Sequence, residues 1–251
     1  MKDLKKLLLK IDSQKKILDT HRPLSPSVLA RLKEYFDLEW TYTSNAIEGS
    51  TLSRRETLLV LKHGLTVKGK QLKEHIEVIN HKEAIDYVES LAKAKNKITE
   101  ETVKYIQQLV TAKTIDVENT GEYRKEQIYI AGAEHIPPKE NEIPKLMKAF
   151  IKWINTKESD KLHPIEKSAI AHYKFVYIHP FVDGNGRTAR LIMNLLLMQK
   201  GYPIAIIRET DRGDYYDALS KADKGKPEPF ILLVAEAVYR TMGKYLASIP
   251  V

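Results

Sequence analysis

Apolar residues along the chain recur mainly at three- and four-residue spacing, which is the period of an amphipathic helix. Over residues 27–42, for example, Leu29, Leu32 and Phe36 share one helical face. Strict alternation of apolar and polar residues is scarce and is best over 127–131, before a glycine and a Pro-Pro exit. The pattern predicts a mostly α fold with one short β-hairpin, and helices over residues 4–18, 27–42, 52–63, 71–95, 99–113, 143–155, 163–178, 187–200 and 228–246.

The 251 residues have ordinary globular values, with 43% hydrophobic and 29% charged residues. A chain of this length buries enough surface for a core of its own. We find no internal repeat, low-complexity tract or long linker. We therefore expect one compact unit, in which N-terminal helices over residues 1–40 precede a main domain over residues 41–251.

Composition also excludes several chemistries. The chain has no cysteine, so disulfides, thiolate-bound zinc and thiol nucleophiles are ruled out. Its net charge of +8 favours an anionic partner without deciding which one. The apolar run near the start covers only residues 7–9, too short for a secretory signal or a membrane span. We expect a soluble cytoplasmic protein with no membrane partner.

The densest run of unusual residues is HPFVDGNGRTAR at 179–190, between two predicted helices. Its glycines allow residues 183–186 to turn tightly into a helix start, where free backbone N–H groups and the helix dipole attract anions. Arg187 and Arg190 share one face of the first turn, where the dipole disfavours cations unless an anion such as a polyphosphate compensates. Asp183 offers a hard oxygen ligand for Mg²⁺, and His179 a general base.

Turn formation is the plain alternative, because Asp-Gly and Asn-Gly are common in turns. The His-Pro before the turn and the Arg-x-x-Arg after it favour function instead. The run in fact resembles the Fic-family signature at every specified position. Residues 121–138 look like that family's flap, 163–200 like its central helices, and 215–230 like its nucleotide-side wall.

The resemblance implies a Fic-type helical core that transfers AMP from ATP to a Ser, Thr or Tyr hydroxyl of a target protein and releases pyrophosphate. In that reading His179 deprotonates the hydroxyl, Asp183 holds Mg²⁺ and Phe181 anchors the loop in the core. The nucleotide would be bound by Gly184, Asn185, Gly186, Arg187, Arg190 and, at the base, Tyr216.

A second segment, SNAIEG at 44–49, resembles the family's inhibitory motif. The resemblance implies an inhibitory helix near residues 41–49, in which Ser44 and Glu48 are regulatory and Glu48 pairs with Arg190. That pair would remove the cation that the γ-phosphate needs. The alternative is an ordinary helix-end carboxylate beside a glycine cap. In some relatives the same glutamate supports the removal of AMP, so a de-AMPylating hydrolase stays open.

The predicted strand edge suggests how a target docks. An extended target segment could pair with the main chain of Gln127, Ile128, Tyr129 and Ile130. The alternative is a hairpin that merely covers the core.

Other residues of the chain resemble functional motifs less closely. Residues 64–71 imitate a phosphate-binding loop but lack the Ser or Thr after Lys70. His172, His179 and Asp183 could form a metal triad of a phosphohydrolase. The net charge also suits a non-catalytic nucleotide- or nucleic-acid-binding module, although no recognition-helix module follows, so nucleic acid is an unlikely partner. A homodimer is left open.

Overall fold

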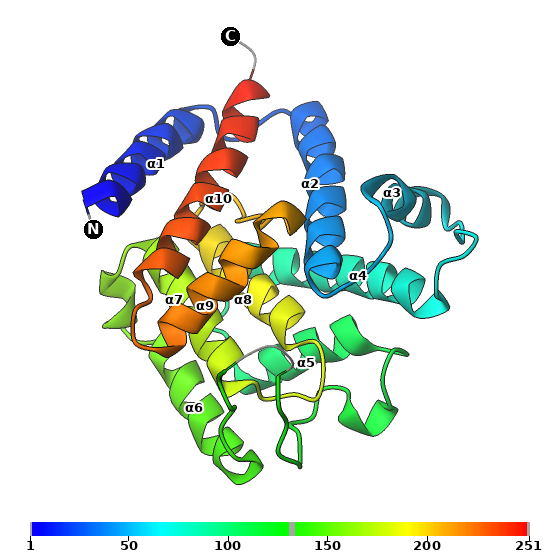
Figure 1. Ribbon diagram of the computed structural model, residues 1–251. Coiled ribbons are helices and arrows are strands. Elements are labelled where there is room, and N and C mark those ends of the chain that lie inside the picture. The colour runs from blue at the N-terminus through cyan, green and yellow to red at the C-terminus, as the bar shows by residue number, and fades with distance from the viewer. Residues whose placement is uncertain (1, 131–133, 250–251) are drawn as a thin grey trace.

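The computed structural model describes residues 2–130 and 134–249, and most of them are helical, which confirms the mostly α fold (Figure 1). The α-helices are α1 Lys2–Thr20, α2 Pro26–Ile47, α3 Arg54–His63, α4 Leu72–Ala94, α5 Glu100–Thr111, α6 Ile143–Ile154, α7 Pro164–Ile178, α8 Asn185–Gln199, α9 Arg212–Asp223 and α10 Glu228–Ala247. Single 3₁₀ turns are η1 Val117–Asn119, η2 Glu140–Glu142, η3 Ser159–Lys161 and η4 Glu209–Asp211.

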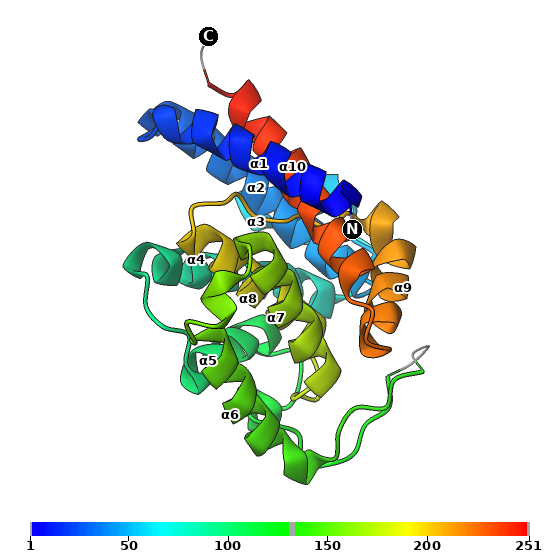
Figure 2. The same ribbon diagram turned by 90° about the vertical axis from the view of Figure 1, so that its left-hand side faces the viewer.

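Helix α8 lies at the centre of the molecule. Nearly all of its side chains are buried, and α7, α4 and α5 pack against it. Two apolar clusters share α8: one includes residues of α2 and α4–α7, the other residues of α1, α7, α9 and α10. Helices α1 and α10 pack together as an outer layer on the second cluster (Figures 1 and 2). The start of α8 therefore stands on a well-packed base.

Helix α2 connects the N-terminal region to that centre. Ser25 caps its start, with Pro26 at the first position, and the helix runs to Ile47 before Gly49 leaves it at a φ of 103°. The prediction ended this helix at residue 42 and placed the inhibitory segment near 41–49. Instead, Ser44 belongs to the last turn of one continuous helix that crosses residue 40. The division of the chain at that residue stays a prediction.

Helix α9 was missed by the sequence analysis. Its buried residues are Tyr215, Ala218, Leu219 and Ala222, which have helical spacing but include two small alanines. A stripe with so little apolar volume gives a weak periodic signal, and Gly213 in the first turn weakens it further.

The expected β-hairpin is not confirmed. Residues 127–130 contain no strand, and Ala131, the last residue of the expected strand, lies outside the described residues. The two legs of the flap are joined by a side chain instead: the Gln127 amide donates to the carbonyl oxygens of Ile128 (3.1 Å) and Pro137 (3.0 Å). Pro137 and Pro138 have no N–H to donate, so the returning leg is poorly suited to a backbone ladder.

Candidate active site

His179 follows α7 and turns the chain toward the glycine loop. Its φ is 49°, in the left-handed region, and Pro180 disfavours a helical conformation at this position. Burial lowers the pKa of the imidazole to about 4, and the Arg124 guanidinium acts in the same direction. The ring is therefore neutral near pH 7, the form that accepts a proton. Its Nδ1 is buried, and the nearby backbone of Val176 raises the pKa of the ring against the larger effect of burial.

The loop that leads into α8 is braced from within and from α5. The Asn185 side chain accepts from the Phe181 N–H (3.0 Å) and donates to the Phe181 carbonyl (2.8 Å). Gln107 donates to the carbonyl of Asp183 (3.0 Å). Gly184 has a φ of 78°, and a Cβ there would lie 2.8 Å from a side-chain carbon of α5. These hydrogen bonds occupy the Asn185 amide. The groups of the loop that remain to bind an anion are therefore its backbone N–H groups.

Arg190, one turn into α8, is surrounded by acceptors. Its Nε donates to Ser44 Oγ (2.9 Å), and Nη2 donates to the Ser44 carbonyl (2.8 Å) and to Glu48 Oε1 (2.7 Å). Nη1 donates to the Tyr215 hydroxyl (3.3 Å). The side chain is only 3% exposed, against 33% for Glu48. The contact expected between Glu48 and Arg190 is thus present, and the end of α2 supplies three of the four acceptors.

Glu48 also covers the start of α8. Its Oε1 lies so close to Gly186 that a Cβ at that position would collide with it. The carboxylate is near enough to His179 to raise the pKa of the imidazole against the larger effect of burial. A carboxylate therefore stands where the helix start would attract a phosphate.

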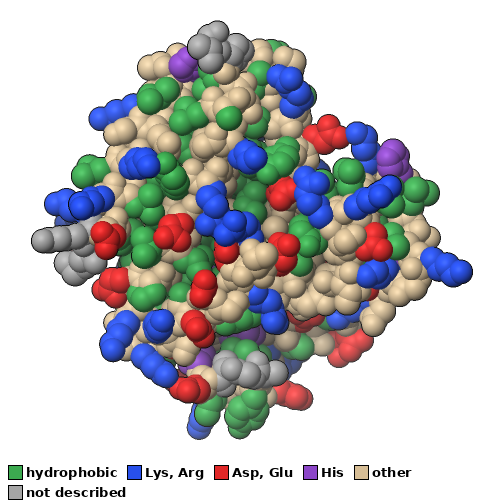
Figure 3. Space-filling model, turned by 45° about the horizontal axis from the view of Figure 1, so that its top comes forward, with side chains coloured by type: hydrophobic (Ala, Val, Ile, Leu, Met, Phe, Trp, Pro, Cys, Tyr) green, Lys and Arg blue, Asp and Glu red, His purple; other side chains and the backbone are tan. Residues whose placement is uncertain are grey.

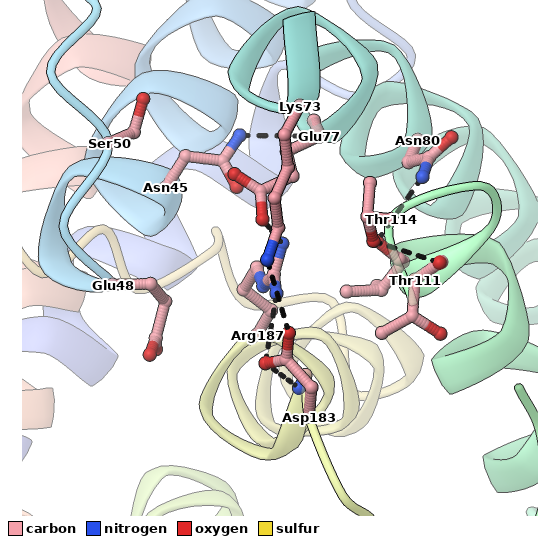
Figure 4. A network of polar contacts seen from close by, with 12 residues as sticks. Asn45, Glu48, Ser50, Lys73, Glu77, Asn80, Thr111, Thr114, Asp183 and Arg187 are labelled. Atoms are coloured by element: carbon pink, nitrogen blue, oxygen red, sulfur yellow. Dashed lines mark hydrogen bonds and ion pairs between the residues drawn. The ribbon is translucent and has the colours of Figure 1, made fainter. Parts of the chain in front are cut away.

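Arg187 is engaged differently, and the sequence analysis did not foresee its partner. Its Nη1 lies 3.1 Å from Glu77 Oε1, and its Nη2 donates to Asp183 Oδ1 (3.3 Å). Glu77 lies in the second turn of α4, and the side chains of Arg187 and Glu77 are 3% and 14% exposed (Figure 4). Lys73, one turn earlier on α4, reaches the other oxygen of Asp183 at 4.0 Å. The four residues form a chain of alternating charges across the loop.

Asp183 fits a magnesium site that is completed by the nucleotide. Its carboxylate is partly exposed, and Oδ2 is approached only by Lys73 among the described residues. Residues 2–130 and 134–249 contain no group of three or more His, Asp and Glu placed to hold a metal. Mg²⁺ commonly binds with one or two carboxylates together with substrate phosphates and water, so a single carboxylate is compatible with the expected ion.

The other candidate residues lie around this centre. His172 is fully buried and its Nε2 is 3.2 Å from the Tyr215 hydroxyl, so it supports Tyr215 and forms no metal triad with His179. Tyr216 is 42% exposed, and its hydroxyl donates to the Ile47 carbonyl at the end of α2 (3.4 Å). It therefore lies beside the end of α2 that carries Glu48.

The flap is tied to the segment that carries His179 by Arg124, another residue that the sequence analysis missed. This buried side chain donates to the carbonyls of His179 (2.9 Å) and Glu126 (2.8 Å) and also bonds the carbonyl of Pro138. Tyr129, by contrast, is 77% exposed. The base of the flap is thus fixed beside His179, while at least one of its apolar side chains faces solvent.

Comparison with known proteins agrees with this geometry. Residues 97–197 match the model of the Fic/DOC family. A solved structure of Fic-1 from C. elegans (residues 134–508) is 30% identical, with a TM-score of 0.89, over 97% of this chain and 72% of that one. The chain belongs to the Fic family. A Fic-domain signaling protein from Bacteroides thetaiotaomicron is 29% identical with a TM-score of 0.88, over 96% of both chains.

Curated Fic relatives carry an activity in their names. The protein adenylyltransferase Fic of Nematostella vectensis is 41% identical over 244 residues, which is 96% of this chain and 56% of the relative. The chain thus spans about half the length of that relative. In residues 2–130 and 134–249, every helix is too short or too polar to cross a membrane.

Proposed function

We propose that this Fic chain transfers AMP from ATP to the hydroxyl of a Ser, Thr or Tyr side chain of a protein, and that Glu48 restrains the reaction. One observation carries the proposal: Glu48 covers the anion-binding start of α8 and pairs with Arg190, beside a neutral imidazole. The names of the curated relatives, which are protein adenylyltransferases, support the same activity.

The chemistry follows from the positions of these groups. His179 takes the proton of the target hydroxyl, and the hydroxyl oxygen forms a bond to the α-phosphorus while the bond to the bridging oxygen of pyrophosphate breaks. The loop N–H groups and Arg190 stabilise the charge on the phosphates. Asp183 would hold Mg²⁺, which supplies charge neutralisation to the phosphates when it is bound.

Glu48 would restrain the reaction through its charge. Arg190 donates one Nη2 hydrogen bond to Glu48 and its other hydrogen bonds to Ser44 and Tyr215. A triphosphate must displace Glu48 before Arg190 can bind it, and the carboxylate also repels the phosphates at the start of α8. The pair is partly exposed and close to a helix end, so a shift of the end of α2 would release it.

Label transfer tests this proposal. ATP labelled at the α-phosphate is incubated with candidate target protein and the wild-type chain, Glu48→Ala, or Glu48→Ala with His179→Ala. We expect strong labelling by Glu48→Ala alone. Glu34→Ala is the matched control, because Glu34 is an exposed acid on the same helix. Equal labelling by all four proteins would refute the proposal.

Removal of AMP is the second candidate, and Glu48 Oε2 favours it. This oxygen accepts no hydrogen bond from the described part of the chain and could orient a water. Glu48→Ala would then lose the release of AMP from a modified protein. A nucleic-acid-binding module gains no support from the surface: Lys and Arg are interleaved with Asp and Glu on the face shown in Figure 3.

A further inference from the structure

Lys73 is a cation beside the candidate site that no motif of the sequence pointed out. It lies in the first turn of α4, and its side chain is 49% exposed. Its Nζ is 4.0 Å from Asp183 Oδ2, a weak contact at the edge of an ion pair. Figure 4 shows it extending from α4 toward the loop, on the same face of the helix as Glu77.

The two arginines at the start of α8 have shorter ion-pair contacts than Lys73. Arg187 is buried between Glu77 and Asp183, at 3.1 and 3.3 Å. Arg190 is buried against Glu48 at 2.7 Å. Lys73, in contrast, contacts no acid other than Asp183 within 4.0 Å in residues 2–130 and 134–249. It is the most exposed of the three cations and the one with the longest contact.

Binding of the nucleotide would change the partner of Lys73. A divalent cation held by Asp183 would compete with Lys73 for this carboxylate, which Lys73 now approaches only to 4.0 Å. An ammonium on a flexible four-carbon stem can then turn to the nearest remaining anion. In a nucleotide site that anion is a phosphate, and ATP carries most of its negative charge on the β- and γ-phosphates.

We propose that Lys73 binds the β- and γ-phosphates of the nucleotide and neutralises the departing pyrophosphate. The inference rests on the proposed function and adds a residue from α4 to it. Arg187 then serves mainly as a positioning residue, held by Glu77 and holding Asp183. The triphosphate is bound by the loop, by Arg190 once it is released, and by Lys73.

The test compares two ligands in the Glu48→Ala background. This background removes the restraint by Glu48, which would otherwise lower the affinity of the site for the nucleotide. Calorimetry measures the Kd of a non-hydrolysable ATP analogue and of AMP, both with Mg²⁺. Lys73→Ala should weaken binding of the analogue about ten-fold, the scale of one charged contact, and change that of AMP less than about two-fold. Lys73→Arg should restore most of the loss.

Lys93→Ala is the matched control, because Lys93 is exposed in the last turn of the same helix. It should leave both Kd values unchanged, and all variants should melt at the temperature of the parent. Unchanged affinity of Lys73→Ala for the analogue, or an equal loss for AMP, overturns the phosphate contact. Failure of the Glu48→Ala parent to bind either nucleotide overturns the proposed function as well.

Discussion

The two arginines in the first turns of α8 differ in the position of the acid that each one contacts. Arg190 meets Glu48, which is partly exposed at the end of α2. Arg187 contacts Glu77, whose side chain is nearly buried in the second turn of α4, and also Asp183 in the loop before α8. A pair at a helix end can open when the helix end moves, whereas a pair inside a packed helix opens only with loss of packing. The comparison suggests one regulatory pair and one structural pair in the same site.

The largest expected effect comes from opening the first pair. Glu48→Ala should tighten binding of an ATP analogue about 10- to 100-fold, because Arg190 regains donors for phosphate and a like charge leaves the start of α8. The free energy of unfolding should fall by about 1 to 2 kcal/mol, because the buried Arg190 then keeps only the uncharged acceptors of Ser44 and Tyr215. Calorimetric titration and urea unfolding measure the two effects. Unchanged affinity would remove Glu48 from the regulatory role.

Breaking the second pair should affect the stability of the fold more than nucleotide binding. Glu77→Ala leaves the buried Arg187 with Asp183 as the only acid near it among the described residues, and should lower the free energy of unfolding by about 2 kcal/mol. Urea unfolding measures this loss, with Glu83→Ala, an exposed acid on the same helix, as the control. A loss no larger than that of Glu83→Ala would show that Arg187 does not depend on Glu77.

The pH profile tests the imidazole that lies beside the regulatory pair. Because burial holds the pKa of His179 near 4, the ring stays neutral as the pH falls to about 5. An imidazole with its usual pKa near 6.5 would lose about four-fold in activity between pH 8 and pH 6. We expect kcat/KM of Glu48→Ala to stay nearly constant over that interval. A half-maximum near pH 6.5 would contradict the buried neutral base.

Ser44 should give the smallest effect. Ser44→Ala removes one acceptor of Arg190 but leaves the Ser44 carbonyl and Glu48 in place. The partial release should raise label transfer by the otherwise unaltered chain about five-fold or less. No increase in label transfer would show that Glu48 and the Ser44 carbonyl hold Arg190 without the Ser44 hydroxyl.

Much of this arrangement was predictable from the sequence. Periodic apolar positions located most helices to within a few residues, and the dense run at 179–190 located the loop. The Glu48–Arg190 contact was inferred from a resemblance, and geometry then showed it. Helix α9 was missed because alanines form much of its buried stripe.

The partners from α4 and the flap could not be predicted. Glu77 and Lys73 are spaced by one helical turn, but their sequence does not say that this face meets the loop. Arg124 is a basic residue in a segment without periodicity, and only the fold shows it buried against the His179 carbonyl. Such contacts join segments far apart in the chain, and local patterns carry no information about them.

The central claim is that one of the two acid–arginine pairs is a switch and the other is a support. Label transfer from α-labelled ATP to a target protein, measured side by side for the wild-type chain, Glu48→Ala and Glu77→Ala, tests it most directly. We predict a strong increase for Glu48→Ala and none for Glu77→Ala. An equal increase for both, or an increase for Glu77→Ala alone, would contradict the claim.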